Sequence, residues 1–165
     1  MNRAVLTFLV VLVVLVCLTL NSMPQVPNPV AVHFNATNAP DGWTSQNAYR
    51  IAVLAALVGA PVLLVWLMGW MPRLTSGKGQ VPDHHYWFDP ARRRETYAFL
   101  LQHASWLGSM TAAVIYVFHI LILRANALDP PQLSSDRLIT VILIYLCGLA
   151  WWTTAFLRHF KRFKS

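Results

Sequence analysis

The sequence predicts an all-α integral membrane protein, a four-helix transmembrane bundle with an ordered external loop between the first two spans. Hydrophobic residues make up 56% of the chain and charged residues only 12%, a balance typical of lipid-embedded surface. Four apolar runs approach or exceed the roughly 20 helical residues that cross a hydrocarbon core about 30 Å thick. Ten of the thirteen Lys and Arg residues fall on one side if the runs span in turn.

The apolar runs set the boundaries of the predicted spans, which cover about residues 4–23, 51–71, 98–123 and 138–157. With four spans in 165 residues, we expect a single membrane domain, 1–165, and no separate soluble domain. The first run follows Arg3, as the apolar part of a secretory signal follows a basic residue. The run is long and no small-residue cleavage site follows it, so we expect the span to be retained; its removal would leave three spans.

The placement of the cations predicts the orientation in the membrane. Only three cations lie on the second side, namely Arg50, Arg124 and Arg137. Short loops rich in Lys and Arg stay in the cytoplasm, so both termini are expected inside and residues 21–49 and 124–137 outside. The net charge of +7 follows this sidedness and forms no single stripe, so nucleic acid is not an expected partner, whereas the lipid bilayer is. The ten cations of the first side are Arg3, Arg73, Lys78, Arg92, Arg93, Arg94, Arg158, Lys161, Arg162 and Lys164.

Small residues recur every fourth position in two of the spans, which predicts grooves where another helix approaches closely. Span 3 also carries most of the polar side chains, so it is predicted to be the central packing helix. Asp89-Pro90 is predicted to cap its first turn. The small-residue positions are Ala52, Ala56 and Ala60 in span 2, and Ala104, Gly108 and Ala112 in span 3.

The external loop holds the strongest candidate site. Residues 30–34 alternate weakly and predict a short strand, and Pro40-Asp41-Gly42 predicts a turn. A histidine such as His33 changes charge near neutral pH and binds metals or carboxylates, and Trp43 is a candidate interfacial anchor. One interpretation is a ligand or peptide site at the outer surface. The other is a purely structural loop in which His33 bonds Asp41 or the backbone.

Span 3 carries two further histidines, His103 and His119. The sixteen residues between them place them about 160° apart around a helix, so they do not face one site. His119 lies toward the outer side, where we expect it near the loop that carries His33, as an interhelical hydrogen-bond partner or a proton relay. His103 lies toward the inner side, within reach of His84, His85 or His159.

The inventory of reactive side chains argues against an enzyme. No nucleophile–base pair is visible, Glu95 is the only glutamate, and the aspartates all lie in predicted loops. Asp83-His84-His85 lacks the further ligands that a metal site needs. A bis-histidine haem needs facing histidines on two helices, and only span 3 has histidine within its apolar run. We therefore expect no metal and no cofactor.

The loop also carries a sequence signature, His33-Phe34-Asn35 followed by Pro40-Asp41-Gly42-Trp43 and then a transmembrane run. This pattern resembles bacterial membrane proteins that carry domain of unknown function 1648, over about residues 1–72. That family overlaps with SdpI-type proteins, whose named member gives immunity to a secreted toxin. The resemblance implies a fold and a place in the bacterial cytoplasmic membrane, adds Asn35 to the candidate residues, and implies no reaction.

Three hypotheses of function follow. The first is a small non-enzymatic multi-pass membrane protein, acting in toxin immunity or envelope signalling, that meets a peptide or another membrane protein through the external loop and span 3. The second is an accessory subunit that scaffolds a larger membrane complex. The third is a small proton-linked transporter that uses His119.

Overall fold

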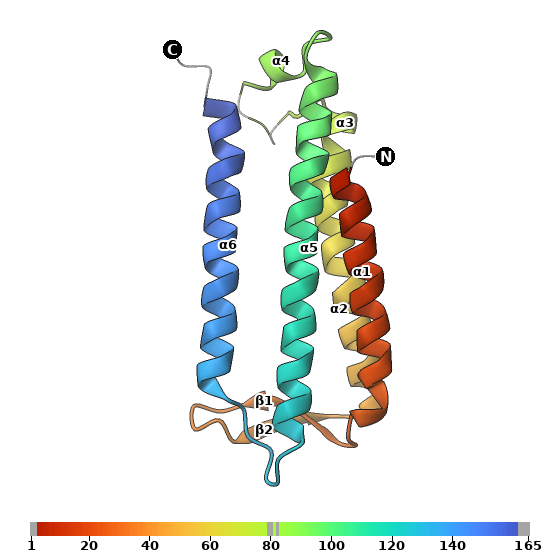
Figure 1. The fold of residues 1–165 in the computed structure, drawn as a ribbon, viewed down its shortest axis with the longest axis vertical. Helices are drawn as coiled ribbons and strands as arrows, with labels where there is room; N and C mark the ends of the chain where they lie inside the picture. The colour runs from red at the N-terminus through yellow and green to blue at the C-terminus, as the bar shows by residue number, and fades with distance from the viewer. Residues whose placement is uncertain (1–2, 79–80, 82, 162–165) are drawn as a thin grey trace.

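The computed structural model describes residues 3–78, 81 and 83–161 and shows an upright bundle of long helices (Figure 1). The long helices are α1 (Arg3–Ser22), α2 (Gln46–Val65), α5 (Arg93–Asn126) and α6 (Ser135–Lys161). Among the described residues, four helical segments are long and apolar enough to cross a membrane. This confirms the predicted four-helix membrane fold. Arg162 and Lys164 of the predicted basic tail lie outside the described residues.

The helices extend beyond the apolar runs that predicted them, because hydropathy marks the lipid-buried part of a helix and not its capped ends. α1 continues into a 3₁₀ turn, η1 (Met23–Gln25). α2 begins before the predicted residue 51 because the Ser45 side chain accepts a hydrogen bond from Ala48 N at 3.3 Å. It continues through a π-helical segment, η2 (Trp66–Trp70), and α3 (Met71–Thr75), and ends at Ser76, whose φ is 50°.

The predicted start of the third span was wrong. α5 begins at Arg93 and not at Pro90, and the short helix α4 (His84–Trp87) precedes it. The Asp89 side chain accepts from Ala91 N at 2.9 Å, so it closes a local turn. The Asp89 carbonyl then accepts from both Arg92 N and Arg93 N, which places the helix start three residues later than the Asp-Pro pattern indicates.

α5 is the central helix of the bundle, as predicted, and lies between α6 and the pair α1 and α2 (Figure 1). Ala104, Gly108 and Ala112 are all buried. A Cβ atom on Gly108 would lie 2.8 Å from Val65 Cγ2 and 2.9 Å from Phe8 Cε2. The absence of a side chain at Gly108 therefore sets how closely α1 and α2 approach α5.

The small-residue stripe of span 2 behaves differently. Ala52, Ala56 and Ala60 are exposed, so no helix within the described part of the chain packs on them. α2 instead buries Leu57, Pro61 and Val65, and it packs against α5. The four-residue spacing is thus present on α2, but the face that α2 buries is the one that carries Leu57, Pro61 and Val65.

A two-stranded antiparallel hairpin crosses one end of the bundle (Figure 1). β1 (Val30–Phe34) confirms the predicted strand, but β2 (Pro40–Thr44) occupies the residues that predicted a turn. The chain reverses within residues 35–39 instead, where Asn38 adopts the left-handed conformation at φ 63°. Asparagine tolerates this conformation through its short polar side chain, which explains why the turn needs no glycine.

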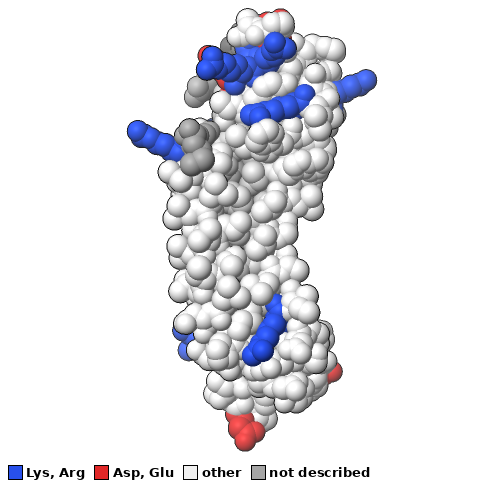
Figure 2. Space-filling view, turned by 90° about the vertical axis from the view of Figure 1, so that its right-hand side faces the viewer, with Lys and Arg blue, Asp and Glu red and all other residues white. Residues whose placement is uncertain are grey.

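The two ends of the bundle differ in charge. Figure 2 shows Lys and Arg gathered at the end opposite the hairpin, which also carries both chain termini in Figure 1. We call this the basic end, formed by α3, α4, the start of α5 and the last turn of α6. The hairpin end comprises β1, β2, η1 and residues 127–134 between α5 and α6. The polypeptide thus has two distinct polar ends separated by an apolar body.

The close helix approach at Gly108 predicts that alanine destabilises the protein at this position but not at Gly59. Gly108→Ala should lower the free energy of unfolding by about 1–3 kcal/mol, because its methyl group overlaps Val65 and Phe8. Gly59→Ala is the matched control: nothing lies within 4 Å of its Cβ position, and alanine favours helix by up to about 1 kcal/mol. Unfolding in detergent micelles measures both, and equal effects would contradict the assigned helix packing.

Candidate functional site

One side chain at the end of α5 binds the base of the hairpin to the bundle. Asn126 Oδ1 accepts from Ala31 N at 2.8 Å, and Asn126 Nδ2 donates to Ala31 O at 2.9 Å. The carboxamide thus pairs with β1 as a neighbouring strand would, and satisfies backbone groups of a residue that is 0% exposed. Asn126 Nδ2 also donates to Ile122 O at 2.9 Å, which orients the amide.

Sequence reasoning missed Asn126. The signal was a single carboxamide at the end of a long apolar run, where a helix leaves the membrane and a side chain can turn back to a loop. That signal is weak because asparagine also ends helices for local reasons.

The tip of the hairpin is tied to the start of α6. The Asn38 carbonyl accepts from Leu133 N at 3.2 Å, and Asn38 Oδ1 accepts from Ser135 Oγ at 2.6 Å. Asn35 closes the turn, since its Oδ1 accepts from Thr37 N at 2.9 Å and from Ala39 N at 3.1 Å. Asn35 is therefore a turn residue, and the hairpin is held at both its base and its tip.

His33 and Asp41 form a pair on the outer surface of the hairpin. His33 Nδ1 and Asp41 Oδ1 are 2.5 Å apart, and the two side chains are 74% and 42% exposed. The contact depends on Gly42 opposite His33, where an added Cβ would lie only 2.7 Å from His33 Cβ. Gly42 is thus required for close strand pairing and not for the positive φ expected of a turn. The carboxylate orients the imidazole and leaves Nε2 directed to solvent.

Two apolar side chains are exposed near this pair. Val32 is 39% exposed and Trp43 is 50% exposed, whereas Val30 and Ala31 at the start of β1 are buried. Val32 occupies the irregular position between Ala31 and His33, where the register shifts. A bulge of this kind redirects a side chain away from its expected face. The pair and the two apolar groups together form what we call the hairpin face: Val32, His33, Asp41 and Trp43.

His119 lies beneath the hairpin, buried at 2% exposure, and joins three helices. Its Nε2 is 2.7 Å from Ser22 Oγ of α1, and its Nδ1 is 2.9 Å from Tyr49 OH of α2. Ser22 Oγ donates to Thr19 O at 2.7 Å, so its hydroxyl proton is already used and it accepts from His119 Nε2–H. In the neutral ring, Nδ1 then accepts from the Tyr49 hydroxyl.

The expectation that His119 approaches the loop of His33 is met only in part. His119 does lie at the hairpin end, but its two ring nitrogens are occupied by Ser22 and Tyr49. His33 stays on the exposed surface with Asp41. The two histidines therefore lie in different environments. His119 is buried and joins α1, α2 and α5 through Ser22 and Tyr49, an arrangement that we call the His119 contact. His33 is a surface group.

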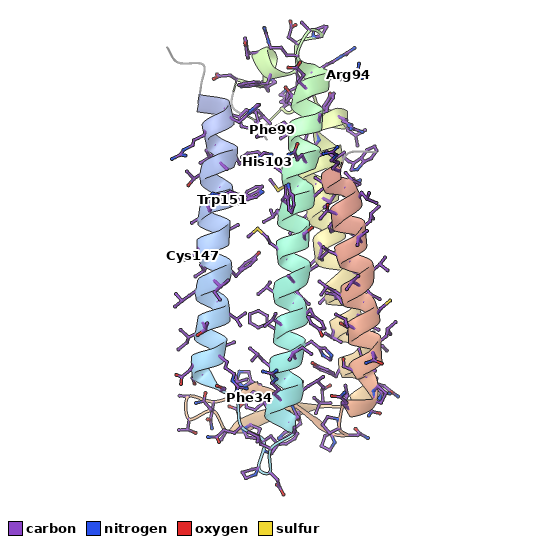
Figure 3. All side chains as sticks on the ribbon, in the orientation of Figure 1. Phe34, Arg94, Phe99, His103, Cys147 and Trp151 are labelled. Carbon is purple, nitrogen blue, oxygen red and sulfur yellow. The ribbon has the colours of Figure 1, made fainter. Side chains whose placement is uncertain are left out.

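His103 lies at the basic end, on the side of α5 that faces α6 (Figure 3). Its ring lies 3.9 Å from the Phe99 ring, which stacks at 3.6 Å on His159, so Phe99 links the two histidines. His84 and His85 contact each other at 3.9 Å between ring centroids. Within residues 3–78, 81 and 83–161, no three His, Cys, Asp or Glu side chains gather so as to hold a metal ion.

The fold and this end of the bundle define a class of protein, an all-α multi-pass membrane protein that carries a docked β-hairpin cap. Residues 7–59 match the family model of Domain of unknown function (DUF1648), so this part of the chain is similar to that family. The match covers most of α1, the hairpin and the first part of α2. No curated protein and no solved structure matches the chain.

The hydrogen bonds of His119 to Ser22 and Tyr49 predict that substitutions at these three residues have non-additive effects on stability. Tyr49→Phe and Ser22→Ala should each lower the free energy of unfolding by about 0.5–2 kcal/mol, the range of hydrogen bonds between membrane helices. Each should cost much less when His119 is already alanine, because the shared partner is gone. Tyr116→Phe is the control, since its hydroxyl makes no hydrogen bond among the described residues although its ring lies 6.5 Å from that of His119. Strictly additive losses of unfolding free energy in a double-mutant cycle would argue against these hydrogen bonds of His119.

Proposed function

We propose that this chain is a non-enzymatic membrane protein that binds a peptide or protein partner through the hairpin face. The observation that carries the proposal is that the hairpin is held firmly against the helices while two of its polar side chains remain exposed. Asn126 binds β1, Asn38 accepts from Ser135 at the start of α6, and Arg50 of α2 donates to Met23 O of η1. These bonds fix residues 23–44 to the helices, yet the pair His33 and Asp41 stays at the surface. An exposed ion pair contributes little to stability, so holding it in place favours a role in recognition.

The composition of the hairpin face suits a polypeptide partner. Trp43 and Val32 offer apolar contact area, and tryptophan is enriched where interfaces concentrate their binding energy. His33 Nε2 can donate or accept a hydrogen bond, and beside it the second carboxylate oxygen of Asp41 can accept one. A peptide with a basic group and an apolar side chain matches this arrangement.

The proposed orientation places the hairpin face outside a bacterial cytoplasmic membrane and the basic end inside. Support comes from the sorting of cations, since the hairpin end carries three arginines and the other described Lys and Arg residues gather at the opposite end. Toxin immunity or envelope signalling is the concrete form of the proposal, because a partner would then arrive from outside the cell. The resemblance to SdpI-type proteins supports the same direction.

The accessory-subunit alternative has one specific observation in its favour. Ala52, Ala56 and Ala60 form an exposed small-residue stripe on α2, a surface that suits close contact with a helix of another protein. The transporter alternative has less support, because both ring nitrogens of His119 are used to hold helices together.

A photocrosslinking experiment tests the hairpin face. A benzophenone side chain at Val32 should capture a partner in native membranes, and His33→Ala or Asp41→Ala should reduce the captured amount at least fivefold. Ala36→Gln, an exposed change in the turn, should leave capture unchanged. The same probe at Leu74, which is 79% exposed at the basic end, is the positional control.

Capture that is equal at Val32 and Leu74, or insensitive to both alanine variants, would contradict recognition by the hairpin face. Circular dichroism and gel filtration of each variant establish that the fold is retained.

A further inference from the structure

The face between α5 and α6 carries a lengthwise apolar groove that no part of the proposed function uses. α6 packs mainly against α5, and side chains along it such as Leu143, Ile144 and Leu146 are 50–68% exposed. One hollow of about 340 Å³ lies midway along the two helices, lined among others by Met110, Val114, Ile144 and Gly148. Volumes of this size are typical of small-molecule sites.

The groove continues from this hollow toward the hairpin end. A second hollow of about 320 Å³ shares Val117 and Val141 with the first, so the two are continuous. Its far end is polar, lined by Arg124, Asp136 and Arg137. The groove thus has an apolar length within the span and a charged mouth where the helices leave the membrane.

The charges at the mouth are available to a ligand. Arg124, Asp136 and Arg137 are exposed, and none of them forms an ion pair with another described residue. Arg50, the other arginine of the hairpin end, instead donates to Met23 O at 2.7 Å. The two arginines of this end that make no ion pair among the described residues therefore gather, with one carboxylate, at the mouth of this groove.

We propose that the groove binds a single phospholipid whose headgroup contains both a phosphate and a primary ammonium, as in phosphatidylethanolamine. The arginines bind the phosphate, which matches the planar, multiply donating guanidinium group. Asp136 accepts from the ammonium group. One acyl chain lies in the apolar length beside Met110, Ile144 and Gly148, so the headgroup is at the hairpin end.

The charge pattern selects this headgroup over the alternatives. Two arginines and one aspartate complement a phosphate beside a cation better than an anionic headgroup, which offers Asp136 no opposite charge. A choline headgroup has a cation but no N–H to donate to the carboxylate. The site uses residues of α5 and α6 only, so it stands independently of the hairpin face.

Native mass spectrometry of the full chain in mild detergent tests the site, with added phosphatidylethanolamine, phosphatidylglycerol or phosphatidylcholine. The wild-type chain should retain one phosphatidylethanolamine in preference to the other two lipids. Arg124→Gln with Arg137→Gln should lose the bound lipid, and Asp136→Asn should lose the preference over phosphatidylglycerol. Arg158→Gln, an exposed arginine on α6 at the basic end, is the matched control and should retain binding.

A second variant fills the groove instead of changing its charge. A Cβ on Gly148 would already lie 2.7 Å from Met110 Cε, so Gly148→Leu should exclude the acyl chain and abolish retention. Retention of lipid by both the double arginine variant and Gly148→Leu would overturn the proposal. So would a disulfide between Ile144→Cys residues of two copies in native membranes, because a second copy would then cover the groove.

Discussion

The membrane itself imposes the constraint on which the whole structure depends. Hydrocarbon offers no hydrogen-bond partner, so each backbone polar group inside it must be satisfied within the chain. The apolar runs meet this constraint as helices, and irregular backbone is confined to the two ends, where water and headgroups are available. Charge follows the same rule, since Lys and Arg side chains gather at the ends and most of them at one end.

Within that constraint, α5 organises both the bundle and its cap. Gly108 and the neighbouring small residues bring α1 and α2 close to it, and His119 adds a polar contact to each of them. At its end, Asn126 binds β1 through both groups of its carboxamide. The hairpin therefore depends on its contacts with α5 and is not an independent folding unit. This explains how a two-stranded hairpin, marginal in isolation, is stable here.

Much of this architecture was predictable from sequence, because hydropathy and cation placement report directly on the bilayer. The four spans, the central role of α5 and the strand at residues 30–34 all follow from local patterns. The second strand was not predictable in the same way: Pro40-Asp41-Gly42 has turn chemistry, yet Gly42 serves a close cross-strand contact with His33. Contacts between distant residues, such as Asn126 with Ala31 and His119 with Tyr49, leave no periodic signal. They depend on which helices become neighbours, and the exposed stripe on α2 shows that small-residue spacing alone does not decide this.

The central proposal is that the hairpin end faces outside the cell and the basic end faces the cytoplasm. The most direct measurement is labelling of intact cells with a membrane-impermeant thiol reagent, in a chain without Cys17 and Cys147. Ala36→Cys in the hairpin turn and Ser76→Cys beside α3 are both exposed positions. The account predicts that Ala36→Cys reacts in intact cells and that Ser76→Cys reacts only after the membrane is opened. The reverse pattern would contradict it, because the hairpin face would then lie in the cytoplasm.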